Sequence, residues 1–383
     1  MTQLSLVIDR CGDDSMSQEC RWGILSTATI ARKNWQAIRR SGAGVVAAVA
    51  SRDVSRAERF IDECQAEQPF ASRPVALGSY EELLANPAID AVYIPLPTGV
   101  RKEWVIKAAQ AGKHVMCEKP CAITADDLQE MIAACEAHGV QFMDGVMYMH
   151  SARMPRMREV LDEGSTVGEI RRITTQFSFR APDEFLRENI RMSSELEPHG
   201  CLGDLGWYTI RFALWAMRYE LPRAVTGRML SQQGRADSPE AVPMEFSGEL
   251  LFDGGVSAGF YCSFLTEHQQ WVNISGSKGQ IALNDFVLPW YGNELEFHGE
   301  NARFVVDGCE FRMERHQRIH RLEEYSNSHA TSQETNLFRT FGELVMSGTV
   351  DGHWPMVSLR TQQVMDACLT SARQGGVEVP LAR

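Results

Sequence analysis

Strand-like and helix-like segments alternate through the first 145 residues of this chain, and this alternation constrains the fold more than any other feature. Each short apolar run is followed by a longer segment with helical periodicity. Neighbouring parallel strands need a crossover connection, and an α-helix is the usual one. The pattern therefore predicts an α/β fold with a doubly wound parallel sheet and right-handed crossovers. The expected strands are 21–25, 45–50, 91–94, the run that leads to Lys119, and 140–143.

After about residue 150 the pattern changes to extended runs with fewer helices between them. Segment 170–179 alternates as an antiparallel strand does. We therefore expect a mobile N-terminal extension (1–20), an N-terminal domain (21–145) and a C-terminal α/β domain (146–383) with a mostly antiparallel open sheet. Further strands are expected at 224–230, 244–252, 255–264, 271–276 and 279–284, and helices at 155–161, 202–217, 334–346 and 358–373.

The charge balance disfavours two classes of partner. Lys and Arg number 38 against 50 Asp and Glu, which gives a net charge of −12. Such a chain is not expected to bind nucleic acid or an anionic membrane. No apolar run is long enough to span a membrane, and the acidic first twenty residues do not resemble a signal peptide. The ten cysteines are scattered without a paired CxxC, so we expect a reduced, cytoplasmic protein.

His316 and His320 are the one pair of residues that suggests a metal ligand set. Four positions separate them, which is helical spacing and would place both rings on one helix face. No third ligand stands nearby, so we expect no metal site.

The first turn, after the strand 21–25, has the arrangement of a dinucleotide-binding loop. A strand, a turn of small residues and a helix bring backbone N–H groups close to a pyrophosphate. The usual motif is G-x-G-x-x-G/A, and Ser26, Ala28 and Ala31 occupy its positions here. We expect cofactor contacts from Ser26, Thr27, Ala28 and Ile30, and the alternative is an ordinary tight turn.

The end of the second strand predicts which dinucleotide binds. An NAD site places an acidic residue there, whereas this chain has Ser51 and Arg52, with Arg56 one turn later. A guanidinium can pair with a 2′-phosphate, and a serine does not repel it. The residues therefore favour NADP, with NAD possible. In the alternative, both arginines are solvated and Asp53 binds the ribose.

A lysine ends the strand in the run 112–120, because Pro120 follows it and cannot donate to a sheet ladder. The carboxyl end of a parallel strand lies at the crevice where open α/β sheets bind ligands. There the ammonium group of Lys119 could hold a substrate hydroxyl and bias proton transfer. The alternative is a surface lysine at a strand end.

With these features in place, the chain resembles the glucose-fructose oxidoreductase / inositol dehydrogenase family (Gfo/Idh/MocA), in its tyrosine-type subgroup. The resemblance rests on 21–28, 95–98, 111–120 and 200–208, and extends from about Arg21 to the C-terminus. It implies an N-terminal Rossmann domain and a C-terminal α/β domain whose open sheet commonly mediates oligomers. It also implies cofactor contacts from the loops after the third and fourth strands expected here. These contacts are Pro95, Leu96, Thr98, Glu118 and Lys119.

The resemblance assigns the acid/base position to Tyr208. Asp204 and Tyr208 are four residues apart, so a helix would place them on one face, which Arg211 and Trp215 continue. A tyrosine with a pKa near 10 is a poor base unless a cation lowers that pKa, and Lys119 would be the cation. Asp204 would bind a substrate hydroxyl or orient the pair. In the alternative, Tyr208 is a core aromatic and Asp204 a helix-start acid.

Three positions depart from the residues common in the family. Thr98 replaces an asparagine, Arg101 a histidine, and Met149 an arginine. These positions line the nicotinamide side or the substrate pocket in relatives, so substrate choice cannot be copied from any one of them. His150 is predicted to touch substrate, or else to be a satisfied buried histidine. Glu118 is expected to fix its turn more than to take part in the chemistry.

We therefore expect an NADP-dependent oxidoreductase that acts on a secondary alcohol or ketone of a carbohydrate, a cyclic polyol or a dihydrodiol. We expect it to form a homo-oligomer, a dimer or a tetramer. Two alternatives remain: a glycosidase with bound NAD that oxidises, eliminates and reduces again, and a cofactor-sensing regulator without turnover.

Overall fold

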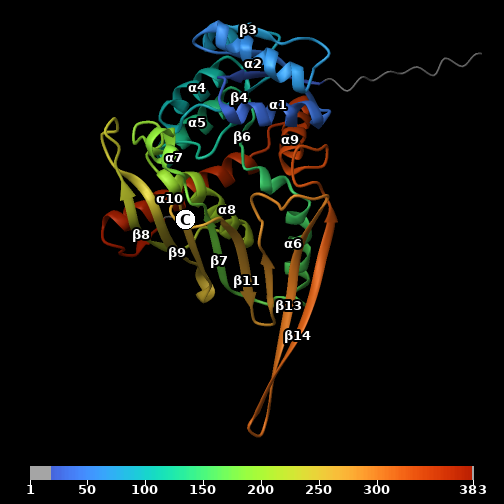
Figure 1. Ribbon diagram of the computed structural model, residues 1–383, viewed down its shortest axis with the longest axis vertical. Helices are drawn as coiled ribbons and strands as arrows, with labels where there is room; N and C mark the ends of the chain where they lie inside the picture. The colour runs from blue at the N-terminus through green and yellow to red at the C-terminus, as the bar shows by residue number, and fades with distance from the viewer. Residues whose placement is uncertain (1–18, 382–383) are drawn as a thin grey trace, which may run out of the picture.

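The computed structural model describes residues 19–381 of the chain (Figure 1). Of the predicted extension 1–20, residues 1–18 lie outside the described residues. Strand β1 begins at Cys20, one residue before its expected start. Among residues 19–381, no helix has the length and apolar character needed to cross a membrane.

The N-terminal domain is built on a six-stranded sheet with the order β3-β2-β1-β4-β5-β6, and all its strand pairs are parallel. This confirms the doubly wound parallel sheet. Sequence analysis missed the short, partly exposed strand β3. The strands are β1 (Cys20–Leu25), β2 (Gly44–Ala50), β3 (Val75–Leu77), β4 (Ala91–Ile94), β5 (His114–Cys117) and β6 (Phe142–Asp144). The helices are α1 (Thr29–Ser41), α2 (Val54–Glu67), α3 (Tyr80–Ala85), α4 (Thr98–Gln110) and α5 (Ala125–Ala137).

Local signals in the sequence account for these helices. Trp35 and Ile38 share the buried side of α1, and Gly42 ends that helix in the left-handed conformation with φ 68°. Thr124 caps α5, because its side-chain oxygen accepts a hydrogen bond from the backbone N of Asp127 at 3.1 Å. The helices therefore begin and end where local chemistry favours it.

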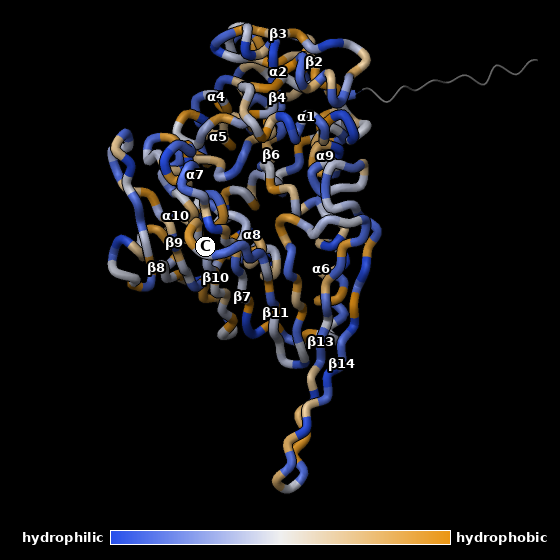
Figure 2. The backbone as a smooth tube through the Cα atoms, in the orientation of Figure 1, coloured by the Kyte–Doolittle hydropathy of each residue, from blue (hydrophilic) through white to orange (hydrophobic). Residues whose placement is uncertain are grey.

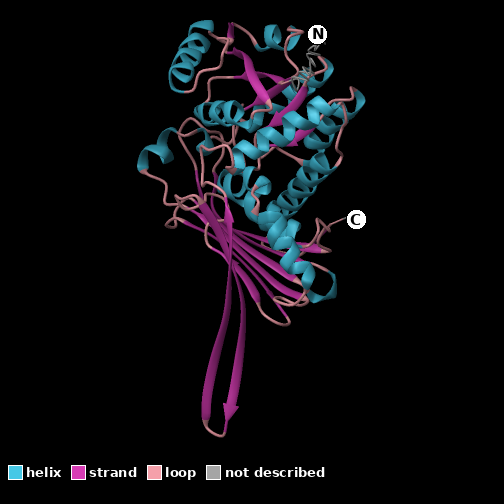
Figure 3. Ribbon diagram, turned by 90° about the vertical axis from the view of Figure 1, so that its right-hand side faces the viewer, coloured by secondary structure: helices cyan, strands magenta, loops and turns pink. Residues whose placement is uncertain are grey.

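The C-terminal domain has a nine-stranded sheet with the order β14-β13-β12-β11-β7-β10-β9-β8-β15 (Figure 3). Only the pair β7–β10 is parallel among the described strands of this sheet, so the predicted mostly antiparallel sheet is confirmed. Its strands are β7 (Ile170–Ser178), β8 (Ala224–Gln233), β9 (Val242–Leu251), β10 (Ser257–Ser263), β11 (Gln269–Gly276), β12 (Gln280–Leu283), β13 (Glu294–Asp307), β14 (Glu310–Glu323) and β15 (Val379–Pro380). Its longer helices are α6 (Arg153–Glu163), α7 (Asp183–Glu188), α8 (Trp207–Ala216), α9 (Gln333–Ser347) and α10 (His353–Arg373).

The hairpin of β13 and β14 extends away from the body of the protein, and hydrophilic and hydrophobic residues mix along it (Figures 2 and 3). Sequence analysis did not predict it, because most of β14 is exposed and charged and has no buried face to produce an alternating pattern. The helical spacing inferred for His316 and His320 was wrong, since both lie on β14. Four residues along a strand span about 13 Å, too far to share one ion. Among residues 19–381, no cluster of three His, Cys, Asp or Glu side chains is placed to hold a metal.

Helices α6, α8 and α10 pack on one face of the nine-stranded sheet (Figure 3). Phe246 and Leu250 of β9 are buried, while Ser247 and Glu249 alternate with them and are only half-buried. Arg172 of β7 and Glu249 form an ion pair. The uncovered face is therefore largely polar.

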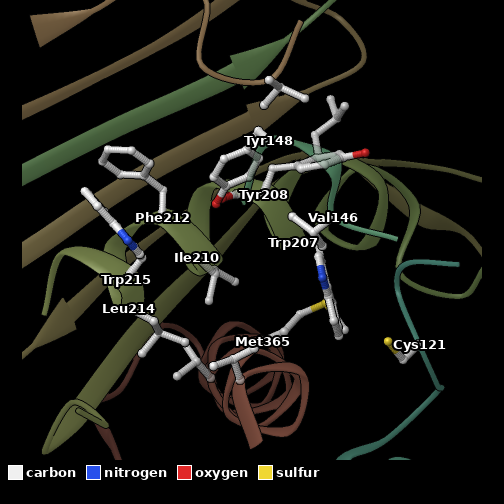
Figure 4. Packing of buried hydrophobic residues seen from close by; sticks show 14 of the residues in the cluster. Cys121, Val146, Tyr148, Trp207, Tyr208, Ile210, Phe212, Leu214, Trp215 and Met365 are labelled. Carbon is white, nitrogen blue, oxygen red and sulfur yellow. The ribbon is translucent and has the colours of Figure 1, made fainter. Parts of the chain in front are cut away.

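Two hydrophobic cores each contain residues of both domains. Helix α9 packs against α1, and Phe338 and Phe341 place their rings 5.2 and 5.1 Å from that of Trp22 in β1. The second core surrounds α8, whose residues are all buried (Figure 4). Trp207, Phe212 and Trp215 of α8 pack there with Met365 of α10. A rigid, buried helix therefore carries Tyr208.

Candidate active site

A cavity of about 990 Å³ lies at the carboxyl edge of the parallel sheet, and both domains line it. From the N-terminal domain, residues that follow β1, β4, β5 and β6 reach it; they are Ala28, Pro95, Leu96, Glu118, Lys119 and Gly145. From the C-terminal domain, Phe177, Asp204 and Tyr208 face it. This is the position where doubly wound sheets bind ligands.

The turn after β1 keeps the conformation of a dinucleotide-binding loop without its first two glycines. Ser26 has φ 121°, a region in which a non-glycine residue is strained by about 1–3 kcal/mol. Its hydroxyl accepts a hydrogen bond from the backbone N of Ala28 at 3.3 Å. Ala28 precedes α1 without a side-chain cap, and Ala28, Thr29 and Ile30 line the cavity. The N-terminus of α1 is thus presented to a bound anion. Ser26 and Thr27 shape the turn but do not line the cavity.

The end of β2 lies outside this cavity. Ser51 is buried, and its backbone N donates to the carbonyl oxygen of Leu77 at 3.1 Å. Arg52 and Arg56 are exposed. Asp53 caps α2 by accepting from the backbone N of Ser55 at 2.9 Å and from its hydroxyl at 2.8 Å. The carboxylate that could have bound a ribose is therefore engaged by its own helix.

The predicted catalytic residues meet at the domain boundary. Lys119 Nζ donates to Oδ1 of Asp204 at 2.6 Å and to the carbonyl oxygen of Asp204 at 2.9 Å. It also lies 4.8 Å from the ring centroid of Tyr208. Lys119 comes from the end of β5, whereas Asp204 and Tyr208 come from the C-terminal domain. The fold therefore brings together all three residues, which are far apart in the sequence.

Asp204 lies on a π-helical turn, Leu202–Gly206, that leads directly into α8. Sequence analysis predicted one regular helix from 202 to 217. A Cβ at Gly203 would lie 2.8 Å from Cβ of His199 and 3.1 Å from Cγ of Pro120, so a side chain would not fit there. Single π turns are frequent at functional sites.

Arg191, which sequence analysis missed, binds the same carboxylate. It lies on the 3-10 turn Ile190–Met192 and lines the cavity, and its Nε is 2.8 Å from Oδ2 of Asp204. Burial acts to raise the pKa of Asp204, but Arg191 and Lys119 outweigh it and hold that pKa well below its usual range. No periodic pattern surrounds Arg191, so its sequence carries no signal of this contact.

The pKa of Tyr208 differs from the expectation. Burial raises it above its ordinary value, and Glu118 and Asp204 act in the same direction. Lys119 and Arg191 act to lower the pKa of Tyr208 but do not outweigh these effects. The prediction that Lys119 gives Tyr208 a lowered pKa was therefore wrong for the unliganded site. Tyr208 is a protonated hydroxyl at neutral pH.

Glu118 is held by a buried hydrogen-bond chain. The hydroxyl of Tyr93 donates to Oε1 of Glu118 at 2.6 Å and accepts from Nδ2 of Asn34 at 2.6 Å. Asn34 and its neighbour Lys33 also line the cavity from α1, and sequence analysis missed both. Glu118 is therefore fixed between the first helix and the end of β5.

Thr98 and Arg101 stabilise the loops around the cavity. The hydroxyl of Thr98 donates to Oε2 of Glu197 at 2.7 Å, and its backbone N donates to Oε1 at 3.1 Å. Glu197 thereby binds the N-terminus of α4 from the other domain. The guanidinium of Arg101 donates from Nε to the carbonyl oxygen of Leu96 at 3.0 Å, and it also contacts the carbonyl of Pro120. Thr98 does not line the cavity, whereas Arg101 does.

His150 lies away from the cavity. Its ring is buried and stacks on that of Trp354 at 4.6 Å, and Nε2 has no hydrogen-bond partner among the described residues. Burial lowers the pKa of His150 to about 3. The structure does not place this predicted substrate residue, or Met149, on the cavity wall.

Arg211 also turns away from the cavity, although the helical spacing placed it on the Tyr208 face. Its NH2 lies 2.5 Å from Oδ2 of Asp144 at the end of β6, and both side chains are almost fully buried. Nε of Arg211 donates to the hydroxyl of Thr361 at 2.7 Å, and Trp207 Nε1 donates to Asp144 at 3.2 Å. This cluster fixes α8, and with it Tyr208, to the parallel sheet.

Two family models match the chain. Residues 20–146 match the oxidoreductase family with an NAD-binding Rossmann fold, and residues 154–282 match the GFO/IDH/MocA C-terminal domain. The chain belongs to the Gfo/Idh/MocA family of oxidoreductases. Membership confirms the resemblance seen in the sequence and the Rossmann nature of the first domain.

Several Gfo/Idh/MocA proteins are similar over most of their length. D-xylose 1-dehydrogenase (NADP⁺) 2 of Haloferax volcanii is 34% identical over 69% of this chain and 75% of its own. Trans-1,2-dihydrobenzene-1,2-diol dehydrogenase of Mus musculus is 31% identical over 74% and 79%. A 3-ketoreductase of Actinomadura kijaniata, solved with NADP and TDP-benzene, shares the fold with a TM-score of 0.73, 24% identity, and coverage of 92% and 98%.

Proposed function

We propose that this Gfo/Idh/MocA protein is an NADP-dependent oxidoreductase that interconverts a secondary alcohol and a ketone on a sugar, a cyclic polyol or a dihydrodiol. The observation that carries the proposal is the contact of Lys119 with Asp204 beside Tyr208, at the carboxyl edge of a Rossmann sheet. The nicotinamide supplies or accepts the hydride, and the protein orients the two carbons and handles the proton.

The residues present fit such a cofactor. The uncapped N-terminus of α1, with Lys33 beside it, suits the pyrophosphate. Arg52 and Arg56 are exposed at the end of β2, where a 2′-phosphate would lie, and the engagement of Asp53 by its own helix removes the acidic competitor. The name of the Haloferax relative specifies NADP, which supports the same preference.

Because its pKa is raised, Tyr208 is protonated at neutral pH and has a proton to donate. In the direction of reduction, its hydroxyl gives the proton to the carbonyl oxygen while the hydride arrives at the carbonyl carbon. The tyrosinate that remains is stabilised by the ammonium of Lys119. In the direction of oxidation, the same tyrosinate accepts the proton of the alcohol.

Part of the cavity lining is apolar. Phe177, Phe179, Ile190 and Leu288 line the cavity together with the polar groups near Asp204. A ring that is partly apolar and carries hydroxyl groups matches this mixed lining better than a fully hydroxylated sugar does. The dihydrodiol relative is named for a substrate of that kind.

A substrate panel tests this proposal. Purified protein is incubated with NADP or NAD and with D-xylose, myo-inositol or trans-1,2-dihydrobenzene-1,2-diol, and absorbance of the reduced nicotinamide is followed. We expect turnover with NADP and at least one of these alcohols. Net hydrolysis of a glycoside without net change of cofactor would indicate the glycosidase alternative. Cofactor binding without turnover of any alcohol or ketone would indicate a regulator.

We also propose that the open sheet face mediates a homo-oligomer. The uncovered face carries polar side chains, such as the paired Arg172 and Glu249, and a half-buried Trp271, a residue type common at interfaces. Light scattering at micromolar concentration should give the mass of a dimer or a tetramer, and the mass of a monomer would contradict this proposal.

We also propose that the protein works in the cytoplasm. The nine cysteines among residues 19–381 are all free thiols, which suits a reducing compartment.

A further inference from the structure

Arg191 contacts the candidate catalytic aspartate through the carboxylate oxygen that Lys119 does not use. Its Nε lies 2.8 Å from Oδ2 of Asp204, while Lys119 Nζ lies 2.6 Å from Oδ1. The side chains of Lys119 and Asp204 are 9% and 13% exposed, and that of Arg191 is 36% exposed. One carboxylate is therefore shared by two cations, one deep in the site and one at its rim.

We propose that Arg191 is a positioning residue for proton transfer at Tyr208: it takes part of the charge of Asp204, so that the charge of Lys119 remains available to the tyrosinate. The proposal rests on the function proposed above, because it concerns the same proton. Without Arg191, Lys119 and Asp204 would form a neutral pair, and such a pair does little to stabilise an anion next to it.

The charges around Tyr208 show what Arg191 changes. Lys119 and Arg191 act to lower the pKa of Tyr208, whereas Glu118 and Asp204 act to raise it. Asp144 and Arg211, near the next turn of α8, neutralise each other. The two cations and two anions balance, so the loss of Arg191 would leave an excess negative charge that opposes formation of the tyrosinate.

A purely structural role, as the anchor of its loop, is less consistent with the contacts. The side chain of Asn189 caps the turn by accepting from the backbone N of Arg191 at 3.0 Å. Arg235 holds the same loop, because its NH1 donates to the carbonyl oxygen of Asn189 at 2.9 Å. The guanidinium of Arg191 adds only a longer contact to this loop, from NH1 to Oδ1 of Asn189 at 3.4 Å, whereas its Nε is directed to Asp204 at 2.8 Å.

The first test needs no substrate. Tyrosinate absorbance is followed against pH in the wild type, Arg191→Gln and Arg191→Lys, each compared with the same protein carrying Tyr208→Phe, so that the difference reports Tyr208 alone. We expect Tyr208 to ionise at higher pH in Arg191→Gln, and Arg191→Lys to restore the wild-type curve. Arg187→Gln removes an exposed arginine of α7, the helix just before the turn that carries Arg191, and should leave the curve unchanged. Identical curves for Arg191→Gln and the wild type would overturn the proposal.

The second test uses the alcohol from the substrate panel that is oxidised fastest. We expect Arg191→Gln to lower kcat at pH 7 by about tenfold or more, to move the alkaline rise of kcat to higher pH, and to leave KM within a few-fold. An equal loss of kcat in Arg191→Gln and Arg187→Gln, with a pH profile of kcat unchanged from the wild type, would contradict the proposal. If Tyr208→Phe retains full turnover, the proposed proton transfer fails as well. If Tyr208→Phe is inactive while Arg191→Gln keeps the wild-type profile, only the role of Arg191 fails.

Discussion

Lys119 Nζ and Oδ1 of Asp204 are 2.6 Å apart, and this contact crosses from the end of a Rossmann strand to the turn before α8. Both side chains are largely buried. Burial acts to lower the pKa of Lys119, but Asp204 outweighs it and the pKa is raised. Lys119 therefore stays charged at neutral pH, which the stabilisation of an anion at Tyr208 requires.

The buried pair of Asp144 and Arg211 should contribute strongly to stability. Replacing Arg211 with Met leaves the Asp144 carboxylate buried without a cation, which typically costs about 3–5 kcal/mol. Chemical denaturation should show this as a large fall in the midpoint. Arg73→Met, which breaks the exposed Arg73–Asp62 pair, is the control and should cost less than about 1 kcal/mol. Similar small losses in both variants would show that Arg211 does not fix α8.

Asp366 should make stability depend on pH. Its Oδ2 accepts from the backbone N of Ala125 at 2.6 Å, and burial raises its pKa from 3.8 to about 6. Because the folded chain holds this proton more tightly than the unfolded chain, the resulting stability is complete below pH 3.8 and is lost as the pH rises through 6.

Asp366→Asn keeps the acceptor but cannot ionise. Its stability relative to the wild type should therefore increase by roughly 2 kcal/mol between pH 4 and pH 7. Melting temperatures measured across this range test it, with Asp307→Asn at an exposed position as the control. If the melting temperatures of the wild type and Asp366→Asn change in parallel with pH, Asp366 does not make stability depend on pH.

Arg52 should select NADP over NAD. Arg52→Ala should weaken NADP binding by about 1–3 kcal/mol, the usual value of a hydrogen bond to a charged group, and leave NAD binding nearly unchanged. Titration calorimetry with both cofactors measures this. Arg59→Ala removes an exposed arginine of α2, the helix that follows Arg52, and should change neither affinity. Equal losses for NADP and NAD in Arg52→Ala would show that this arginine does not contact the 2′-phosphate.

Much of the fold and the core of the site could be predicted because local patterns determine them. The buried strands of the parallel sheet are short apolar runs, although β5 ends at Cys117, two residues before the strand end expected at Lys119. The four-residue spacing correctly predicted that Asp204 and Tyr208 lie on the same side, because α8 continues directly from the π turn that carries Asp204. Lys119 could be assigned to the crevice because the carboxyl ends of parallel strands share one edge.

The features that escaped prediction depend on contacts between distant segments. Arg191 lies in a loop without periodicity, and only the fold brings it to Asp204. The helical spacing predicted that Arg211 shares a face with Tyr208, but Arg211 forms an ion pair with Asp144 on the other side. Whether the pKa of Tyr208 is raised or lowered depends on burial of its side chain, which spacing in the sequence does not reveal.

The central claim is that Lys119 and Tyr208 act as one unit in proton transfer. The measurement is kcat for Tyr208→Phe, Lys119→Met and the double variant, with NADP affinity measured separately. Each single change should lower kcat by about 10²–10⁴-fold. The double variant should lose far less than the product of the two, because residues that act together are not additive, and NADP affinity should stay within a few-fold. Near-full kcat in Tyr208→Phe at every pH would contradict the account.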